Sequence, residues 1–209
     1  MAVSGPTFEL GSSEGAQGSC RYVDGATVVL ATASGPQHNP ERASSQDAAR
    51  GGLEVRVQLA DRGGADRVLA ERTLEEAARG LLAPALDCAA FPRQVASVYC
   101  LVLHDGGAAR RCVVNACALA ALDARLPLLA VPLGVDVVVA AAAADGGDAP
   151  RPTTCNVTMD ATTDEPAVLA MDTAGEPFDA ADVAAVVAAA RTEVTALAAA
   201  ALAQQAAAS

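Results

Sequence analysis

The sequence contains few aromatic residues, which make up 2% of its 209 positions, although 52% of the residues are hydrophobic. A core built from this chain must therefore be filled by Val, Leu and Ala, and its helices and strands must pack closely. Long apolar runs are also lacking, since none reaches the roughly 20 residues that a membrane helix needs. The alanine-rich stretch 180–208 is interrupted by Asp182, Arg191 and Glu193. We therefore expect no membrane span.

Positive charge is scarce as well. The chain has 14 Lys and Arg against 25 Asp and Glu, which gives a net charge of −11. This balance argues against a free-standing nucleic-acid binder, which would carry a basic stripe. It leaves room for a subunit whose RNA contacts come from one small basic patch or from its neighbours. An acidic chain also suits electrostatic pairing with basic subunits.

Metal-binding patterns are missing. The chain has two histidines and six cysteines, and no Cys-x-x-Cys pair. We therefore predict no zinc site, no other metal and no cofactor. Most of the cysteines lie in apolar runs, which predicts buried, reduced thiols and a cytosolic or nuclear compartment. The N-terminus shows no secretion-signal pattern, so we expect none.

The most informative stretch runs from Val98 to Asp123. Val98–Leu103 is continuously apolar and predicts a strand buried on both faces. His104-Asp105-Gly106-Gly107 predicts a sharp turn. Cys112–Leu122 is apolar almost all round, which is typical of a helix inside a domain. A strand, a glycine turn and a buried helix could together form a phosphate cradle.

The other segments predict a mixed α/β domain with a loose tail at residues 1–17. Asp24-Gly25 predicts a hairpin, which could dock on a neighbouring subunit or simply belong to the core. Alternation predicts a half-exposed strand at Leu53–Leu59, and helical spacing predicts an amphipathic helix at Val68–Asp87 that is kinked or broken near Pro84. Further predicted elements are a strand pair or bent strand at Val131–Ala144, strands at Asn156–Asp160 and Ala167–Met171, and a final helix opened by Asp179.

Several of these segments resemble the RNase PH fold. Asp105-Gly106-Gly107 followed by Asn115–Ala124 is similar to the core of that family, and Gly18–Ala31 to its opening hairpin. Phe91-Pro92-Arg93 and Gly175-Glu176-Pro177-Phe178 resemble its later segments. The resemblance implies one domain at residues 18–209 with a mixed α+β, ribosomal protein S5 domain 2-like fold of duplicated β-α halves.

The chain departs from the phosphorolytic members of that family at three places. Their Ser/Thr-Arg pair after the glycine turn is replaced by Ala108-Ala109, with Arg110 and Arg111 one and two positions further on. Gly80 and Ala83 stand where their helix supplies arginines, and Ala149–Thr154 replaces their paired acidic residues. Arg110 or Arg111 could partly replace one lost arginine, but neither could replace the carboxylates. We therefore predict that the chain has no catalytic residues and is not an enzyme.

The closest resemblance is to the non-catalytic RNase PH-type ring subunits of the eukaryotic RNA exosome. It implies a structural role in 3′–5′ RNA processing and degradation, rRNA processing included, in the nucleus, nucleolus and cytoplasm. The implied partners are other RNase PH-like subunits in a six-membered ring, S1/KH cap subunits, the exosome nuclease and single-stranded RNA. The alternative is a homo-oligomeric RNase PH-like RNA-binding protein or weak nuclease acting outside the exosome.

Direct RNA contact would need a local basic loop. The first candidates are Arg62 and Arg67 in the glycine-bearing loop 61–67, and the second choices are Arg93, Arg110 and Arg111. The competing interpretation is that Arg62 pairs with Asp61 or Asp66 in a solvated loop and never meets RNA.

Overall fold

The structure, a computed structural model, describes residues 5–38, 49–60, 65–139, 153–163, 165–174 and 180–207. Their strands form two sheets. The first has five strands in the order β1-β2-β3-β5-β4, antiparallel except for the parallel pair β4–β5, and the second has three antiparallel strands in the order β6-β7-β8. The strands are β1 Thr7–Leu10, β2 Gly18–Asp24, β3 Thr27–Gln37, β4 Gly52–Leu59, β5 Val95–His104, β6 Pro132–Val139, β7 Thr153–Asp160 and β8 Ala167–Ala174.

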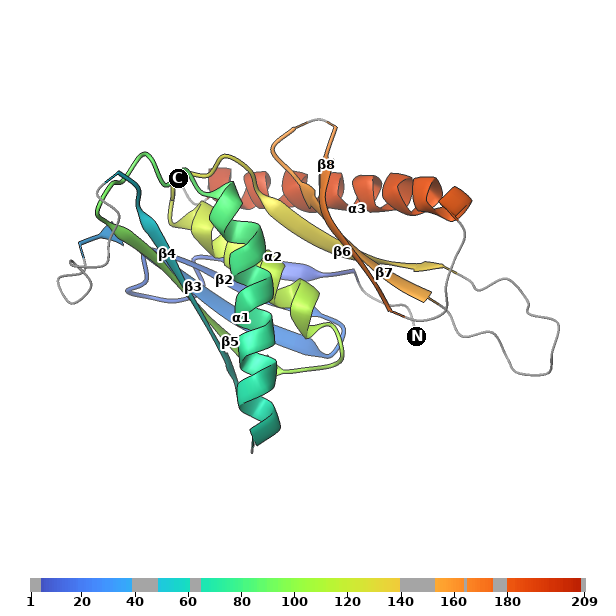
Figure 1. The fold of residues 1–209 in the computed structure, drawn as a ribbon, viewed down its shortest axis with the longest axis horizontal. Helices are drawn as coiled ribbons and strands as arrows, with labels where there is room; N and C mark the ends of the chain where they lie inside the picture. Colours follow the sequence, from blue (N-terminus) through green and yellow to red (C-terminus); the bar gives the residue numbers. More distant parts are fainter. Residues whose placement is uncertain are drawn as a thin grey trace.

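Three helices accompany the sheets: α1 Ala65–Ala85, α2 Ala109–Asp123 and α3 Ala180–Ala207. Figure 1 shows α1 and α2 on the same side of the five-stranded sheet and α3 running along the three-stranded sheet. Helix α2 contacts strands of both sheets, β2, β3 and β5 of the first and β6 of the second. The predicted mixed α/β fold, organised about a buried central helix, is confirmed.

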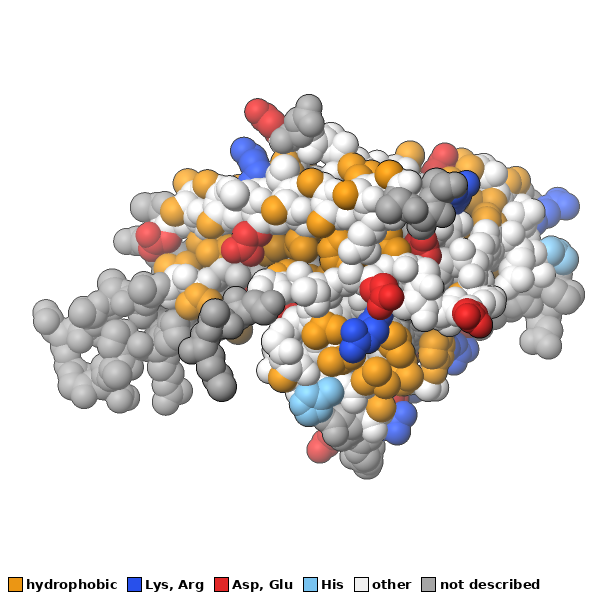
Figure 2. Space-filling model, turned by 180° about the vertical axis from the view of Figure 1, so that it is seen from behind, with side chains coloured by type: hydrophobic (Ala, Val, Ile, Leu, Met, Phe, Trp, Pro, Cys, Tyr) orange, Lys and Arg blue, Asp and Glu red, His pale blue; other side chains and the backbone are white. Residues whose placement is uncertain are grey.

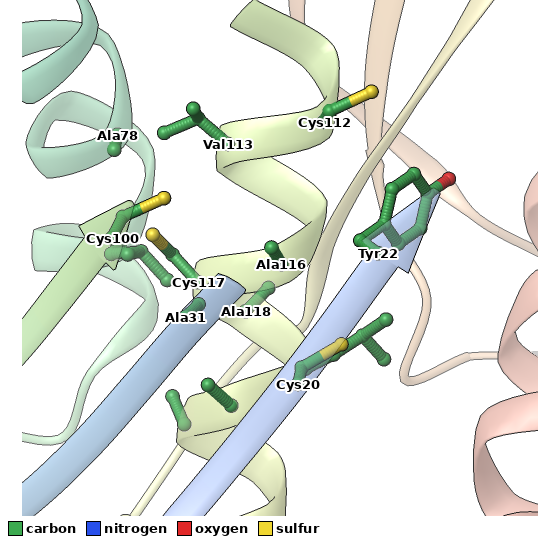
Figure 3. Packing of buried hydrophobic residues seen from close by; sticks show 14 of the residues in the cluster. Cys20, Tyr22, Ala31, Ala78, Cys100, Cys112, Val113, Ala116, Cys117 and Ala118 are labelled. Atoms are coloured by element: carbon green, nitrogen blue, oxygen red, sulfur yellow. The ribbon is translucent and has the colours of Figure 1, made fainter. Parts of the chain in front are cut away.

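Helix α2 is buried without interruption from Cys112 to Ala121, as its sequence predicts, and most of the side chains in this stretch are small. Cys112, Cys117 and Leu119 are at most 1% exposed, and so are Ala116, Ala118 and Ala120. Figure 3 shows the Cys117 sulfur directed toward that of Cys100 on β5. The described thiols are all free. At the C-terminal end of α2 the backbone of Gly18 comes so close that an added Cβ would lie 2.1 Å from the Ala124 nitrogen.

The prediction that β5 is buried on both faces is wrong. Val98, Cys100 and Val102 face the helices and are at most 2% exposed, but Tyr99 and Leu103 on the other face are 39% and 40% exposed. Among the described residues, helices cover only one side of the five-stranded sheet. Figure 2 views the molecule from the open side and shows hydrophobic side chains gathered there.

The prediction of a loose tail at residues 1–17 is also wrong for part of its length. Residues Thr7–Leu10 form β1, which pairs with β2 in the register Phe8↔Tyr22 and Leu10↔Cys20. The ring of Phe8 stacks on that of Tyr22 with centroids 6.3 Å apart. Alternation of Phe8 and Leu10 with polar neighbours is the strand signal, and the short length of the segment hides it.

Polar side chains bind the outer backbone of three edge strands. On β1 the Gln204 side chain accepts the N–H of Leu10 and donates to the carbonyl of Phe8. On β4 the carboxylates of Glu71 and Glu75 accept the N–H groups of Leu59 and Val57. On β6 the Asn115 amide binds the backbone of Gly134. The fourth edge strand, β8, has a bulge opposite Thr158 and Met159.

Helix α3 buries one stripe, with Val186, Ala190, Val194 and Ala201 at most 3% exposed, against β6 and β7. Judged by length and composition alone, Asp182–Ala206 with its mean hydropathy of 1.5 could also cross a membrane. The mostly buried core helix of a soluble protein passes the same test, whereas 17% of this window is buried, in the stripe that packs on β6 and β7.

Candidate functional site

A polar cavity lies where the sequence predicts a phosphate cradle, at the N-terminus of α2. It has a volume of about 400 Å³ and opens between α2 and the three-stranded sheet. The turn before α2, its first residues and all three strands β6, β7 and β8 contribute. The lining residues are Gly107, Ala108, Arg110, Arg111, Asp136, Thr154, Asn156, Asp172, Thr173 and Ala174.

The turn is held by its own side chains. The carboxylate of Asp105 accepts the N–H of Gly107 at 2.8 Å, and the Thr27 hydroxyl accepts the N–H of Gly106 at 3.0 Å. Gly107 has a φ of +101°, which a side chain would disfavour. Ala108 is the N-cap of α2 and provides no side-chain hydrogen bond. The predicted glycine turn is therefore present, but its two glycine N–H groups are engaged within the chain, and alanines stand where hydroxyl or guanidinium groups would be needed.

Arg110 pairs with Asp172 of β8 across the cavity. Both side chains are about half exposed, 52% for Arg110 and 51% for Asp172. An anion that entered the cavity would therefore compete with a carboxylate of the same chain for the Arg110 guanidinium.

Arg111 is held more deeply, between carboxylates of two sheets. Its Nη2 lies 2.5 Å from Asp24 Oδ2 of β2, and its Nε lies 3.3 Å from Asp136 Oδ2 of β6. Neither contact has the alignment of a hydrogen bond, so the attraction is mainly that of opposite charges in a partly buried setting. Asn156 donates to the other oxygen of Asp136 at 2.7 Å and fixes that carboxylate.

The cysteine nearest to this cluster is not a nucleophile. Burial raises the pKa of Cys112 to about 12, and the neighbouring Asp24 carboxylate acts in the same direction, while Arg111 opposes it. A thiol with that pKa stays protonated at neutral pH. The part of the chain that the structure describes also contains no group of three or more His, Cys, Asp or Glu side chains that could hold a metal ion.

The structure brings two of the five predicted RNA-contacting arginines together, Arg110 and Arg111. Arg67 lies at the start of α1 and binds the carboxylate of Glu71 at 2.7 Å, one turn along the helix. This pair and the N–H of Leu59 lower the pKa of Glu71, and the N–H has the larger effect. Arg93 is exposed at the start of β5, and Arg62 lies outside the described residues.

The three positions where the chain departs from phosphorolytic enzymes are only partly brought together. Ala108 and Thr154 line the cavity. Gly80 and Ala83 are exposed on α1 and do not line it. The two positions on α1 where the resemblance places arginines therefore do not line this cavity. Residues 149–152 lie outside the described residues.

Sequence reasoning missed the acidic side of the cavity. Asp136 and Asp172 are not among the predicted site residues, because each lies in an otherwise apolar strand. An Asp within an apolar strand could still have indicated the site, since such a carboxylate either faces solvent or has a partner. The arginine that each carboxylate meets is 25 or more positions away in the sequence.

Comparison with known proteins agrees with this geometry. Residues 6–127 match the RNase PH family, described as the 3′ exoribonuclease family, domain 1. Rice (Oryza sativa) Rrp46 is 19% identical with a TM-score of 0.70, over 94% of this chain and 93% of that one. An archaeal exosome core is 17% identical with a TM-score of 0.59, over 92% of this chain and 84% of that one.

An Archaeoglobus fulgidus exosome with RNA bound to the active site is 17% identical with a TM-score of 0.61, over 92% of this chain and 86% of that one. These similarities establish a shared fold. No curated protein matches the sequence. Because the family match covers more than half of the 209 residues, the chain belongs to the RNase PH, or 3′ exoribonuclease, family.

Proposed function

We propose that this protein is a catalytically inactive RNase PH-type subunit of an exosome-type ring. In this role it helps to build a six-membered ring that leads single-stranded RNA to a nuclease bound elsewhere. Its neighbours are other RNase PH-like chains, with S1/KH subunits as a cap, and it works in the nucleus, nucleolus and cytoplasm. The fold that it shares with exosome core structures supports assembly into such a ring.

The observation that supports inactivity is the internal charge balance at the α2 cavity. Phosphorolysis needs free positive charge to hold inorganic phosphate next to the scissile ester. Here two guanidinium groups, those of Arg110 and Arg111, already face three carboxylates, those of Asp24, Asp136 and Asp172. A phosphate dianion would meet a cluster with no surplus positive charge.

The second catalytic requirement is a group that can protonate the leaving oxygen. The resemblance to phosphorolytic enzymes places their acidic pair at residues 149–154, and of these Thr154 lines the cavity. A threonine hydroxyl does not ionise near neutral pH and cannot replace a carboxylic acid. Asp136 and Asp172 cannot serve readily either, because both are committed to arginines.

The direct test is phosphorolysis by the purified chain. Incubation with single-stranded RNA and inorganic phosphate should release no nucleoside diphosphates, measured by ion-exchange chromatography. The matched comparison is Arg110→Ala, which should behave like the unaltered chain. Phosphate-dependent release that disappears in Arg110→Ala would overturn the proposal of inactivity.

Ring membership is tested by affinity purification from the native cell. RNase PH-type chains and S1/KH subunits should co-purify in fixed proportion. Size-exclusion chromatography of the isolated chain provides a second measurement. A stable homo-hexamer that recruits no other RNase PH-type chain would favour the alternative, a self-assembled protein outside the exosome.

A further inference from the structure

The two non-glycine residues for which the structure records a positive φ are both arginines. Arg93 has a φ of +59° and Arg125 a φ of +55°. This left-handed region suits glycine or asparagine, because the Cβ of other residues crowds the following carbonyl. Both positions therefore keep a guanidinium at the cost of backbone strain. Strain of this kind is found most often at functional sites.

Arg125 closes α2 at a position that usually carries glycine. Its N–H bonds to the carbonyl of Leu122 at 3.0 Å, and the next N–H, that of Leu126, bonds to the carbonyl of Ala121 at 3.1 Å. This pair of bonds is a Schellman motif with Arg125 at its left-handed residue. The Arg125 side chain is exposed.

Arg93 lies in the turn that leads into β5. The N–H of Gln94 bonds back to the carbonyl of Phe91 at 3.3 Å, and His38 Nδ1 lies 3.4 Å from the carbonyl oxygen of Arg93. Arg50 is close by, because the residues after it, Gly51 and Gly52, bond to the carbonyls of Cys88 and Gln94. Arg50 and Arg93 are both exposed.

These three arginines, Arg50, Arg93 and Arg125, define the basic end of the molecule. They lie where β4 and β5 begin and α2 ends, whereas the cavity lies at the start of α2, about 22 Å away along a 15-residue helix. Within the described residues, no carboxylate pairs with any of their guanidinium groups. Among the described residues, two acids in neighbouring segments are engaged with backbone amides: Asp123 accepts the N–H of Ser19 and Asp87 that of Ala89.

We propose that the basic end binds the phosphodiester backbone of single-stranded RNA. The inference takes its ligand class from the proposed function, but its site is separate from the α2 cavity. Free guanidinium groups pair with phosphate oxygens in a two-pronged geometry. The neighbouring aromatic side chain, Phe91, is 4% exposed and cannot stack on a base. The basic end therefore contacts phosphates without reading the sequence.

The test uses the purified full chain and a fluorescein-labelled oligouridylate, with binding followed by anisotropy over a range of salt concentrations. The variant is Arg93→Gly combined with Arg125→Gly. Loss of two phosphate contacts should weaken binding and reduce the slope of log K against log salt by about 1.4, at about 0.7 per contact on a single strand. Adding Arg50→Gln should reduce the slope by about 0.7 more.

The same glycine variant separates a binding role from a structural one. Glycine relieves the strain at both positions, so the urea midpoint of unfolding should rise while RNA affinity falls. If the arginines serve the fold instead, for example by opposing the helix dipole at the end of α2, the midpoint should fall. A lower midpoint with unchanged RNA affinity would overturn the proposal.

The matched control is Arg72→Gln combined with Arg191→Gln. These two exposed arginines lie on α1 and α3, away from the basic end, and their replacement removes the same net charge. The control should keep the salt slope of the unaltered chain. An equal loss in both double variants, or no RNA binding by the unaltered chain, would overturn the proposal. Neither result bears on inactivity or ring membership, which are measured by nucleotide release and co-purification.

Discussion

The Asn115 side chain makes both hydrogen bonds that the backbone of Gly134 offers at the edge of β6. Its Oδ1 accepts the Gly134 N–H at 2.7 Å, and its Nδ2 donates to the Gly134 carbonyl at 2.8 Å and to the Tyr22 hydroxyl at 3.0 Å. One fully buried amide on α2 thus joins β2 of the five-stranded sheet to β6 of the three-stranded sheet. Asn115 is therefore a buried, uncharged connection between the two sheets, beside the charged one that Arg111 makes.

Asn115→Leu should therefore be severely destabilising. It leaves the Gly134 N–H and carbonyl buried without partners, at roughly 1–3 kcal/mol for each group. We expect the free energy of unfolding to fall by about 3 kcal/mol in urea titrations. Thr73→Ala removes an exposed hydroxyl from α1 and should change it by less than about 0.5 kcal/mol. Equal effects of the two substitutions would contradict this role of Asn115.

Two glycines should respond to alanine with opposite signs. A Cβ at Gly18 would lie 2.1 Å from the Ala124 backbone nitrogen, which cannot move without shifting the end of α2. We expect Gly18→Ala to cost about 1–3 kcal/mol or more. A Cβ at Gly80 meets nothing within 4 Å on the exposed face of α1, so Gly80→Ala should gain about 0.5–1 kcal/mol. Thermal unfolding of both variants checks the signs.

The neighbouring arginines of the cavity should differ in their contribution to stability. Arg110 and Asp172 are both about half exposed, so Arg110→Ala should cost about 0–1 kcal/mol. Arg111→Ala would leave Asp24 and Asp136, which are 11% and 22% exposed, without their counter-charge. We expect a loss of roughly 2–4 kcal/mol from this uncompensated charge. Chemical denaturation at neutral pH compares the two variants, and a larger loss for Arg110→Ala would contradict the assignment.

Stability should decline at alkaline pH because of the buried thiols. The pKa of Cys112 is raised to about 12 in the folded state, whereas an unfolded thiol titrates near about 8.5. Above that pH the unfolded chain has lost a proton that the folded chain keeps, so the free energy of unfolding falls as pH rises. The loss is up to about 1.4 kcal/mol per pH unit for each such thiol.

Urea titrations measure this decline when they are run at neutral pH and again at a pH about one unit above the ordinary thiol pKa. Cys112→Ala should weaken the pH dependence, because it removes one of the titrating groups. The pKa of Cys20 is also raised, mainly by burial, and that of Cys100 by its hydrogen bond with Cys117 and by burial, so part of the decline should remain. A variant with the same pH dependence as the unaltered chain would contradict the role of Cys112.

The local parts of the fold could be predicted from the sequence because they depend on neighbouring residues. The Asp24-Gly25 hairpin, the half-exposed strand that became β4 and the buried helix α2 each carry their own signal within about a dozen positions. The exposure of a strand's side chains could not be predicted in the same way, because it depends on segments that are distant in the sequence. Tyr99 lies in a continuous apolar run, and only the placement of both helices on one face of the sheet leaves it exposed.

In the candidate site, too, the local features could be predicted and the distant partners could not. The glycine turn and both arginines of α2 were recognised because they are contiguous in the sequence. Their carboxylate partners come from β2, β6 and β8, and nothing local indicates that these strands converge on the first turn of α2. The charge balance that argues against catalysis was therefore visible only in three dimensions.

The polar side chains bound along the sheet edges have a consequence for solubility. An unpaired edge strand is a template for another chain, and a protein rich in Val, Ala and Leu would aggregate readily through it. Gln204 occupies the outer backbone of β1, Glu71 and Glu75 that of β4, and Asn115 that of β6. Three of the four edge strands are thus closed to stray strands, which should lower the tendency of a chain with an open apolar sheet face to form fibrils.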